Sequence, residues 1–235
     1  MRHPEADIEA RLLGLAALRL GAETYRAAYG SPAGYQRGHR MSTLDPVRLA
    51  LHLATVFDRL RIRCAVGGSL ASSVFGEPRA TEDVDFVADV RLHDVAPLVE
   101  ALRDEFYVDE AAVRRAVERR SSFNLINLAS ARKVDVFVPS ADALYGRQLT
   151  HSRTVRVSDT PGDDLPMLSP EDVVLQKLAW YRKTGEASER QWRDVLGILK
   201  VQGDRLDWKD LLDVADAAGL RTLLDRARAE ATGHE

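Results

Sequence analysis

The stretch VGGSLASSVFGEPRATEDVDFVAD, residues 66–89, decides how the chain is interpreted. Two glycines and a serine follow an apolar strand, and a second apolar run then carries Asp83 and Asp85 at positions i and i+2. Because alternate residues of a strand point to the same face, the two carboxylates should lie side by side. Like charges repel, and burying them without compensation is costly. A bound divalent cation would remove this conflict.

The turn made by Gly67, Gly68 and Ser69 should lead from the first strand into a short helix. Glycine lets a backbone approach a ligand closely, and exposed amides at a helix start bind phosphate. The alternative is an ordinary strand-to-helix turn. The pattern is neither the dinucleotide fingerprint nor a P-loop, which ends in Gly-Lys-Ser/Thr. The turn is therefore informative only together with the two aspartates.

A third acid strengthens the metal interpretation. Asp135 interrupts the apolar run KVDVFVP, residues 133–139, on the strand face that it shares with Lys133 and Phe137. Three acids on two neighbouring strands suit one or two Mg²⁺ ions, with Mn²⁺ as a substitute, because hard cations take oxygen ligands. For a lone Asp-x-Asp the alternative is a solvated strand end. With the third acid present, we predict a metal site formed by Asp83, Asp85 and Asp135.

Composition argues against several classes of protein, namely strongly basic nucleic-acid binders, disulfide-bonded proteins, zinc proteins and membrane-spanning proteins. The chain has 235 residues and a net charge of −3, so no global basic field indicates a nucleic-acid partner. Its single cysteine, Cys64, excludes an intramolecular disulfide, and the six histidines show no zinc-ligand spacing. No apolar run approaches the roughly 20 residues that span a bilayer. The N-terminus is acidic and lacks a signal-peptide core. Together these features favour a cytoplasmic protein without a membrane partner.

The order of expected elements indicates an α/β (α+β) fold. Residues 1–40 should form a helix and a linker, as an appendage that carries no catalytic group. Residues 41–168 should form a mixed sheet flanked by helices, with helices at 47–60, after Gly68, at 95–105 and around 114–120, and strands at 63–66, 84–89, 123–128 and 133–139. After Pro166 only helices are expected, so residues 169–235 form a helical subdomain, with helices at 169–183, 189–202, 208–218 and 220–230.

Thirteen residues separate the Gly67-Gly68-Ser69 turn from the segment Asp83-Val84-Asp85. This combination resembles the signature of the nucleotidyltransferase superfamily related to DNA polymerase beta. The resemblance covers roughly residues 47–139. It implies a minimal mixed sheet flanked by helices. It also implies transfer of a nucleoside monophosphate from a nucleoside triphosphate to an acceptor hydroxyl, with two Mg²⁺ ions.

The resemblance also implies roles for individual residues. Asp83 and Asp85 would bind both metals, and Asp135 would bind the catalytic metal and help to deprotonate the acceptor. The Gly67-Gly68-Ser69 turn would hold the β- and γ-phosphates, with Gly68 and Ser69 in contact with them. Arg79 would add a cation near the phosphates, the alternative being an ordinary surface arginine.

The helical part adds candidates. Ser169-Pro170-Glu171-Asp172 is a strong helix start, with a serine cap, proline at the first position and acids near the positive end of the helix dipole. On that helix Lys177 falls inside the apolar arc formed by Val173, Val174, Trp180 and Tyr181. A lysine there either covers apolar surface with its stem or points into a cleft toward phosphate. We favour the cleft.

The next helix carries Arg190 and Asp194 on a stripe apart from its apolar face. Lys177 followed by R-x-x-x-D resembles the abortive-infection (AbiEii-like) branch of the superfamily. That likeness implies that Lys177, Arg190 and Asp194 belong to the active site, and that the chain acts as a toxin or in phage defence with an antitoxin as partner. Trp180, Tyr181 and Trp192 are interpreted as helix–helix core.

Two other functions compete with nucleotidyl transfer. One is a non-catalytic binding module of the same fold, such as an antitoxin or a regulatory subunit, although the three acids and the glycine turn argue against it. The other is a metal-dependent glycosyltransferase, which also uses Asp-x-Asp but would not predict the Gly-Ser turn or Lys177.

The acceptor stays open between RNA, a protein side chain and a small hydroxylated molecule. RNA is favoured slightly, because cationic side chains on two helical stretches would contact phosphates if they flanked the cleft. The alternative is a solvated helix face. These side chains are Arg114, Arg115, Arg119, Arg120, Arg182 and Lys183.

Overall fold

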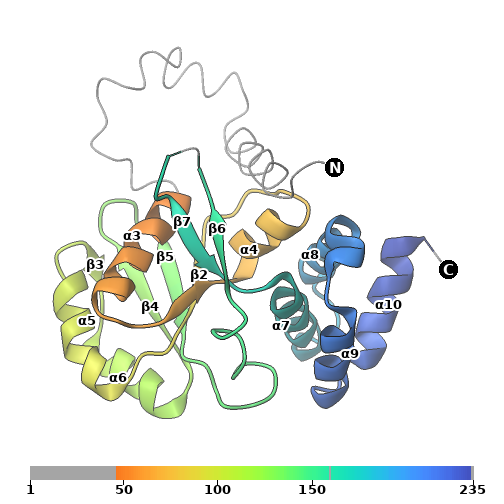
Figure 1. Cartoon of the computed structure of the whole chain (residues 1–235). Coiled ribbons are helices and arrows are strands. Elements are labelled where there is room, and N and C mark those ends of the chain that lie inside the picture. Colours follow the sequence, from red (N-terminus) through yellow and green to blue (C-terminus); the bar gives the residue numbers. More distant parts are fainter. Residues whose placement is uncertain (1–45, 159, 234–235) are drawn as a thin grey trace, which may run out of the picture.

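The computed structural model describes residues 46–158 and 160–233, which form a seven-stranded mixed sheet flanked by helices (Figure 1). The predicted appendage of residues 1–40 lies outside the described residues. The strands are β1 (Cys64–Val66), β2 (Val84–Ala88), β3 (Phe106–Tyr107), β4 (Ser122–Asn127), β5 (Lys133–Phe137), β6 (Arg153–Arg156) and β7 (Asp164–Met167), in the order β3-β4-β5-β2-β1-β7-β6. The α-helices are α3 (Pro46–Arg59), α4 (Gly68–Phe75), α5 (Val95–Leu102), α6 (Glu110–Arg119), α7 (Pro170–Lys183), α8 (Glu189–Gln202), α9 (Trp208–Ala217) and α10 (Arg221–Thr232).

Three strands were not expected from the sequence. Strand β3 has two residues, and β6 is a polar strand with one buried side chain. Strand β7 contains Pro166, which argues against a strand because proline lacks the N–H of the ladder. It nevertheless pairs with β1 in parallel, Val66 opposite Met167, and with β6 antiparallel. The sheet is thus wider than the sequence pattern predicts, while the four α-helices that follow β7 were expected.

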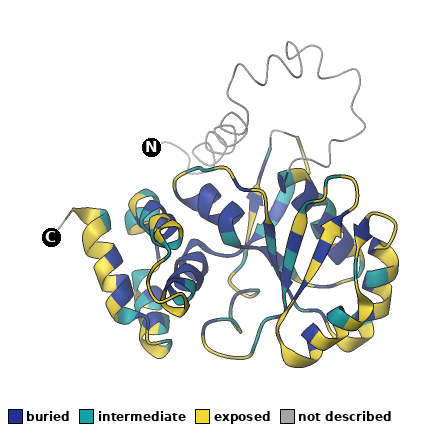
Figure 2. Ribbon diagram, turned by 180° about the vertical axis from the view of Figure 1, so that it is seen from behind, coloured by how far each residue is buried: buried dark blue, intermediate teal, exposed yellow. Residues whose placement is uncertain are grey.

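The two faces of the central sheet differ. On one face Phe86 of β2 contacts the ring of Phe57 of α3, with 5.4 Å between centroids. Buried residues alternate with exposed or half-buried residues along β4 and β5, and the other face of these strands is uncovered when the molecule is seen from behind (Figure 2). Strands β2 and β5 are parallel, with Asp85 opposite Asp135. This register brings the two carboxylates to the uncovered face.

Helices α7 to α10 lie together on one side of the sheet, beyond α4 (Figure 1). Helix α7 is the buried centre of this group, and its N-cap Ser169 accepts a hydrogen bond from the backbone N–H of Asp172. Between α7 and α8, the rings of Tyr181 and Trp192 pack with centroids 5.0 Å apart. Among the described helices, none combines the length and apolar character that crossing a bilayer requires.

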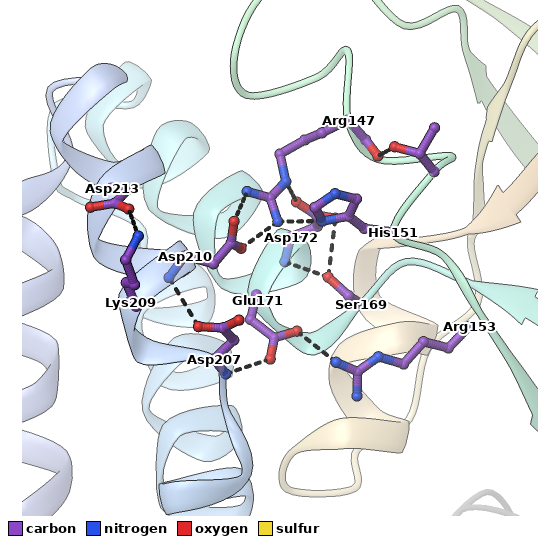
Figure 3. A network of polar contacts seen from close by, with 11 residues as sticks. Arg147, His151, Arg153, Ser169, Glu171, Asp172, Asp207, Lys209, Asp210 and Asp213 are labelled. Atoms are coloured by element: carbon purple, nitrogen blue, oxygen red, sulfur yellow. Dashed lines mark hydrogen bonds and ion pairs between the residues drawn. The ribbon is translucent and has the colours of Figure 1, made fainter.

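A polar network ties the segment between β5 and β6 to α7 and α9 (Figure 3). Arg147 of that segment places its Nε 3.0 Å from Oδ1 of the fully buried Asp172, as an ion pair without hydrogen-bond alignment. Its Nη1 donates to Asp210 of α9 at 2.8 Å. Burial raises the pKa of the Asp172 carboxyl, and the Arg147 guanidinium opposes that shift. Arg147 therefore joins the segment between β5 and β6 to both α7 and α9, and Arg153 of β6 adds a second link to α7 through Glu171.

We expect Arg147→Met to destabilise the protein by about 3 kcal/mol, because it leaves the Asp172 carboxylate buried without its cation. Chemical denaturation monitored by circular dichroism measures the change. The matched control is Arg156→Met, because Arg156 is 56% exposed and lies 3.4 Å from Asp164, which is itself 37% exposed, so its loss should cost less than about 1 kcal/mol. Equal effects of the two substitutions would contradict a special role for the buried arginine.

Candidate active site

A cavity of about 370 Å³ lies where the uncovered face of the sheet meets α4, α7 and the start of α8. It brings together residues that are more than one hundred positions apart in the sequence. The lining residues are Gly68, Ser69, Asp83, Asp85, Asp135, Phe137, Gln176, Lys177, Trp180, Ser188, Arg190 and Gln191. Seven of these twelve are site residues predicted from the sequence, so the pocket is the candidate active site.

The glycine turn is shaped around Asp85. The N–H of Gly67 donates to the backbone carbonyl of Asp85 at 2.9 Å, which continues the pairing of β1 with β2. Gly68 has a φ of +56°, and a Cβ at this position would lie 1.8 Å from Oδ2 of Asp85. The backbone N–H of Ser69 donates to the same carboxylate. Only glycine at position 68 therefore allows the Asp85 carboxylate to reach the start of α4.

The three acids line the same pocket from two strands. Asp85 and Asp135 are half-buried register partners, and Asp83 is exposed immediately before β2. Burial raises the pKa of Asp85, the negative charges of Asp135 and Asp83 raise it further, and Lys177 and the Ser69 N–H oppose the shift. The acids thus form a negative cluster in which the charge of Asp85 is unfavourable without a cation.

The acids offer the oxygen donors that hard divalent cations prefer, so the residues present fit Mg²⁺ in kind. In their present arrangement, no three His, Cys, Asp or Glu side chains of the described residues are grouped to hold one ion. Asp135 is instead engaged by the ammonium of Lys133, 2.8 Å from its Oδ2, and that hydrogen bond raises the pKa of Lys133. Lys133 is 46% exposed, so a cation entering the site can replace it without opening the core.

Lys177 lies in the pocket wall and is 4% exposed, so it does not cover the outer surface of α7. Its Nζ donates to Oδ2 of Asp194 at 2.8 Å. Burial lowers the pKa of Lys177, and the Asp194 carboxylate opposes that shift. Asp194 also receives two hydrogen bonds from Arg79, at 2.7 and 2.8 Å. Asp194 thus pairs with Lys177 and Arg79 from distant segments, and no ion pair to Arg190 joins it along α8.

Ser69 connects the arginines to the glycine turn. Its Oγ accepts hydrogen bonds from Nη2 of Arg79 at 2.6 Å and from Nη2 of Arg190 at 3.0 Å. Because a hydroxyl has two acceptor lone pairs and one proton, the Ser69 O–H remains to donate toward the pocket.

The predicted nucleotide-binding residues divide into two groups. Gly68, Ser69 and Arg190 line the pocket, whereas Gly67, Arg79 and Asp194 are not among the described residues that line it. Arg79 and Asp194 instead hold the lining residues Ser69 and Lys177 through hydrogen bonds.

Sequence reasoning missed five lining residues, namely Phe137, Gln176, Trp180, Ser188 and Gln191. Trp180 was assigned to the helix–helix core, yet it is half-buried in the pocket wall. The available signal was helical spacing. Gln176 and Trp180 are four residues apart and share one face of α7, and Trp180 is also three residues after Lys177, so this face borders that of the lysine.

Of the cationic side chains that favoured RNA, Lys183 lies beside a lining residue, with its ammonium 4.9 Å from the ring centroid of Trp180. None of Arg114, Arg115, Arg119, Arg120, Arg182 and Lys183 is among the described residues that line the pocket. Arg114 pairs with Glu110 at 3.0 Å, and Nη1 of Arg182 donates to the carbonyls of Ala218 and Gly219. The described pocket lining therefore gives no direct support for an RNA acceptor.

No model of a known protein family matches the sequence, and no curated protein matches it. Solved structures resemble its shape. An antigenic nucleotidyltransferase-like protein from Paracoccidioides brasiliensis is 19% identical, with a TM-score of 0.48 over 78% of this chain and 91% of that one. ANT(2'')-Ia in complex with adenylyl-2''-tobramycin is 11% identical, with a TM-score of 0.48 over 77% and 97%. A protein from Thermotoga maritima described as a nucleotidyltransferase is 18% identical, with a TM-score of 0.40 over 66% of this chain and 98% of that one. These values describe a likeness of shape alone.

Proposed function

We propose that the chain is a Mg²⁺-dependent nucleotidyltransferase, which moves a nucleoside monophosphate from a nucleoside triphosphate to an acceptor hydroxyl. One observation carries the proposal: a single pocket has three carboxylates on its sheet side and a glycine-serine turn, a lysine and an arginine on its helical side. Carboxylates suit the metal ions that accompany a triphosphate. Cationic side chains and the N–H and O–H donors beside them suit its phosphates.

The phosphates would lie against the helical side of the pocket. The Ser69 O–H donates to a phosphate oxygen, while Lys177 and Arg190 neutralise its charge. Arg79 and Asp194 act as positioning residues, because Asp194 holds Lys177 and Arg79 holds Ser69. Mg²⁺ bound at Asp83, Asp85 and Asp135 would supply charge neutralisation at the reacting phosphate.

The transfer step forms one bond and breaks one. The acceptor oxygen attacks the α-phosphorus, the bond from that phosphorus to the bridging oxygen of the β-phosphate breaks, and pyrophosphate leaves. Asp135, once released from Lys133, accepts the proton of the attacking hydroxyl. Lys177 and Arg190 stabilise the charge that develops on the leaving pyrophosphate.

The acceptor follows from what surrounds the pocket. Since the arginines of α6 do not line it, we propose a small hydroxylated molecule or a protein side chain in place of RNA. Each phosphate contact to RNA would add about 0.7 to the negative slope of log affinity against log salt. We therefore expect acceptor affinity to change little with salt, and a steep loss would restore RNA as the acceptor.

The deciding experiment incubates the full chain with each of four α-labelled nucleoside triphosphates, Mg²⁺ or Mn²⁺, and cell extract or total RNA. We expect label in a product that survives nuclease, and no label with EDTA or with Asp85→Asn. Nucleotide binding without transfer under all conditions would favour the non-catalytic binding module. Transfer of a labelled sugar from a nucleotide-sugar would favour the glycosyltransferase.

The resemblance to abortive-infection proteins adds a cellular expectation to the same proposal. As a toxin, the chain would slow growth of the cells that express it. Asp85→Asn, expressed to the same level, would not slow growth. Equal growth with both forms argues against a toxin and leaves nucleotidyl transfer untouched.

A further inference from the structure

Two glutamine side chains in the pocket lack a partner. Gln176 of α7 is 7% exposed, and its Oε1 is buried without a hydrogen bond to any described residue. Gln191, in the first turn of α8, has an equally unpartnered buried Oε1. Leaving a buried acceptor unpaired is costly, and native proteins do so where a ligand or water completes the bond. Both glutamines line the candidate active site, so a bound molecule is the natural partner.

The wall that carries these amides differs from the rest of the pocket. Trp180 lies one helical turn after Gln176 on the same face of α7, and the ammonium of Lys183 is 4.9 Å from the centroid of its ring. The wall formed by Gln176, Trp180 and Gln191 carries no formal charge, whereas the remainder holds three carboxylates, a lysine and an arginine. An uncharged, planar and hydrogen-bonding part of the substrate suits such a wall.

Gln176 places one end of this uncharged wall beside the turn that would hold the phosphates. Gln176 lies beside the glycine turn, since its Oε1 is 3.5 Å from the position of a Cβ on Gly67. The group attached to the phosphates is the ribose, whose hydroxyls donate hydrogen bonds to a carbonyl oxygen. Gln191 lies on the other helix that lines the pocket and is half-buried. The base would then reach Gln191 and Trp180.

We propose that this uncharged wall makes the site selective for an adenine nucleotide, with Gln176 accepting a ribose hydroxyl and with Trp180 and Gln191 holding the base. A glutamine amide pairs one acceptor and one donor, which matches adenine at N6 and N7. Guanine presents two acceptors at the same edge and calls for arginine or lysine. Stacking on Trp180 adds to this selection and favours a purine over the smaller pyrimidines.

The inference rests on the proposed function, and binding measurements separate the two. Calorimetry on the full chain with Mg²⁺ compares ATP, GTP, CTP, UTP and inorganic tripolyphosphate, which has no base or ribose. We expect ATP to bind at least about tenfold more tightly than the other three nucleotides. If the four nucleotides bind equally and compete with tripolyphosphate, this inference fails while the proposed function stands. If none of them binds, both fail.

Three substitutions test the role proposed for each side chain of the uncharged wall. Gln176→Met should weaken ATP about tenfold and abolish the difference between ATP and its 2'- and 3'-deoxy forms. Gln191→Met should remove the preference for ATP over GTP, and Trp180→Leu should weaken all four nucleotides at least about tenfold. Tripolyphosphate affinity should stay unchanged in all three.

The matched control is Gln202→Met, on α8 but outside the pocket, where Nε2 donates to the carbonyl of Phe75 at 2.6 Å. It should leave nucleotide selectivity unchanged. If Gln176→Met and Gln191→Met also leave selectivity unchanged while they fold normally, the assignment of the two amides is overturned.

Discussion

Asp85→Asn should lower kcat/KM for nucleotidyl transfer at least about 10³-fold, a loss of about 4 kcal/mol in transition-state stabilisation. The substitution removes a central carboxylate of the negative cluster but keeps the size of the side chain. The same change should leave the free energy of unfolding equal or higher. Burial and the charges of Asp135 and Asp83 already disfavour the ionised Asp85 in the folded protein. Transfer assays and urea denaturation without metal measure the two effects.

Asp89→Asn is the matched control for this experiment. Asp89 follows the same strand, but its carboxylate pairs with Arg63 and Arg91 at 3.3 Å and is not part of the pocket lining. We expect unchanged transfer and a loss of stability below about 1 kcal/mol, typical of exposed pairs. Clear destabilisation by Asp85→Asn with transfer retained would show that Asp85 is a structural residue and would remove the proposed mechanism.

Gly68→Ala should lower transfer at least about 10²-fold, because the new Cβ would lie 1.8 Å from Oδ2 of Asp85. The carboxylate and the turn cannot both keep their positions, so the geometry of the metal-binding and phosphate-binding sides changes together. The left-handed backbone at this position adds strain, of about 1 to 3 kcal/mol in stability. Steady-state kinetics and thermal denaturation measure the two losses separately.

Gly203→Ala separates backbone strain from the clash. Gly203 has a similar φ of +51°, but nothing lies within 4 Å of the position of its Cβ. This variant should lose stability to a similar degree through strain and keep full transfer activity. If Gly68→Ala retains activity to the same extent as Gly203→Ala, the contact between the turn and Asp85 has no functional importance.

Much of the fold follows from local sequence patterns. The Gly-Gly-Ser turn, the Asp-x-Asp strand and the apolar strand around Asp135 are short segments whose conformation depends on neighbouring residues, so spacing alone predicts their order and faces. The helices of the C-terminal part follow from caps and apolar periodicity, as the Ser169 cap illustrates. Strands β6 and β7 could not be predicted, because their stability comes from pairing with each other and with β1.

The sequence by itself therefore determined the three acids, the glycine-serine turn, Lys177 and Arg190 of the site, and that Asp83, Asp85 and Asp135 belong to neighbouring strand faces. Only the tertiary structure decided their partners. Asp194 lies 115 residues from Arg79 and accepts two hydrogen bonds from it, a pairing that no spacing in the sequence indicates. The unpartnered amides of Gln176 and Gln191 became visible only once α7 and α8 had packed beside the sheet. Helical periodicity reports which face of a helix is apolar, whereas the partner of a buried polar group depends on segments that the chain brings together from far apart.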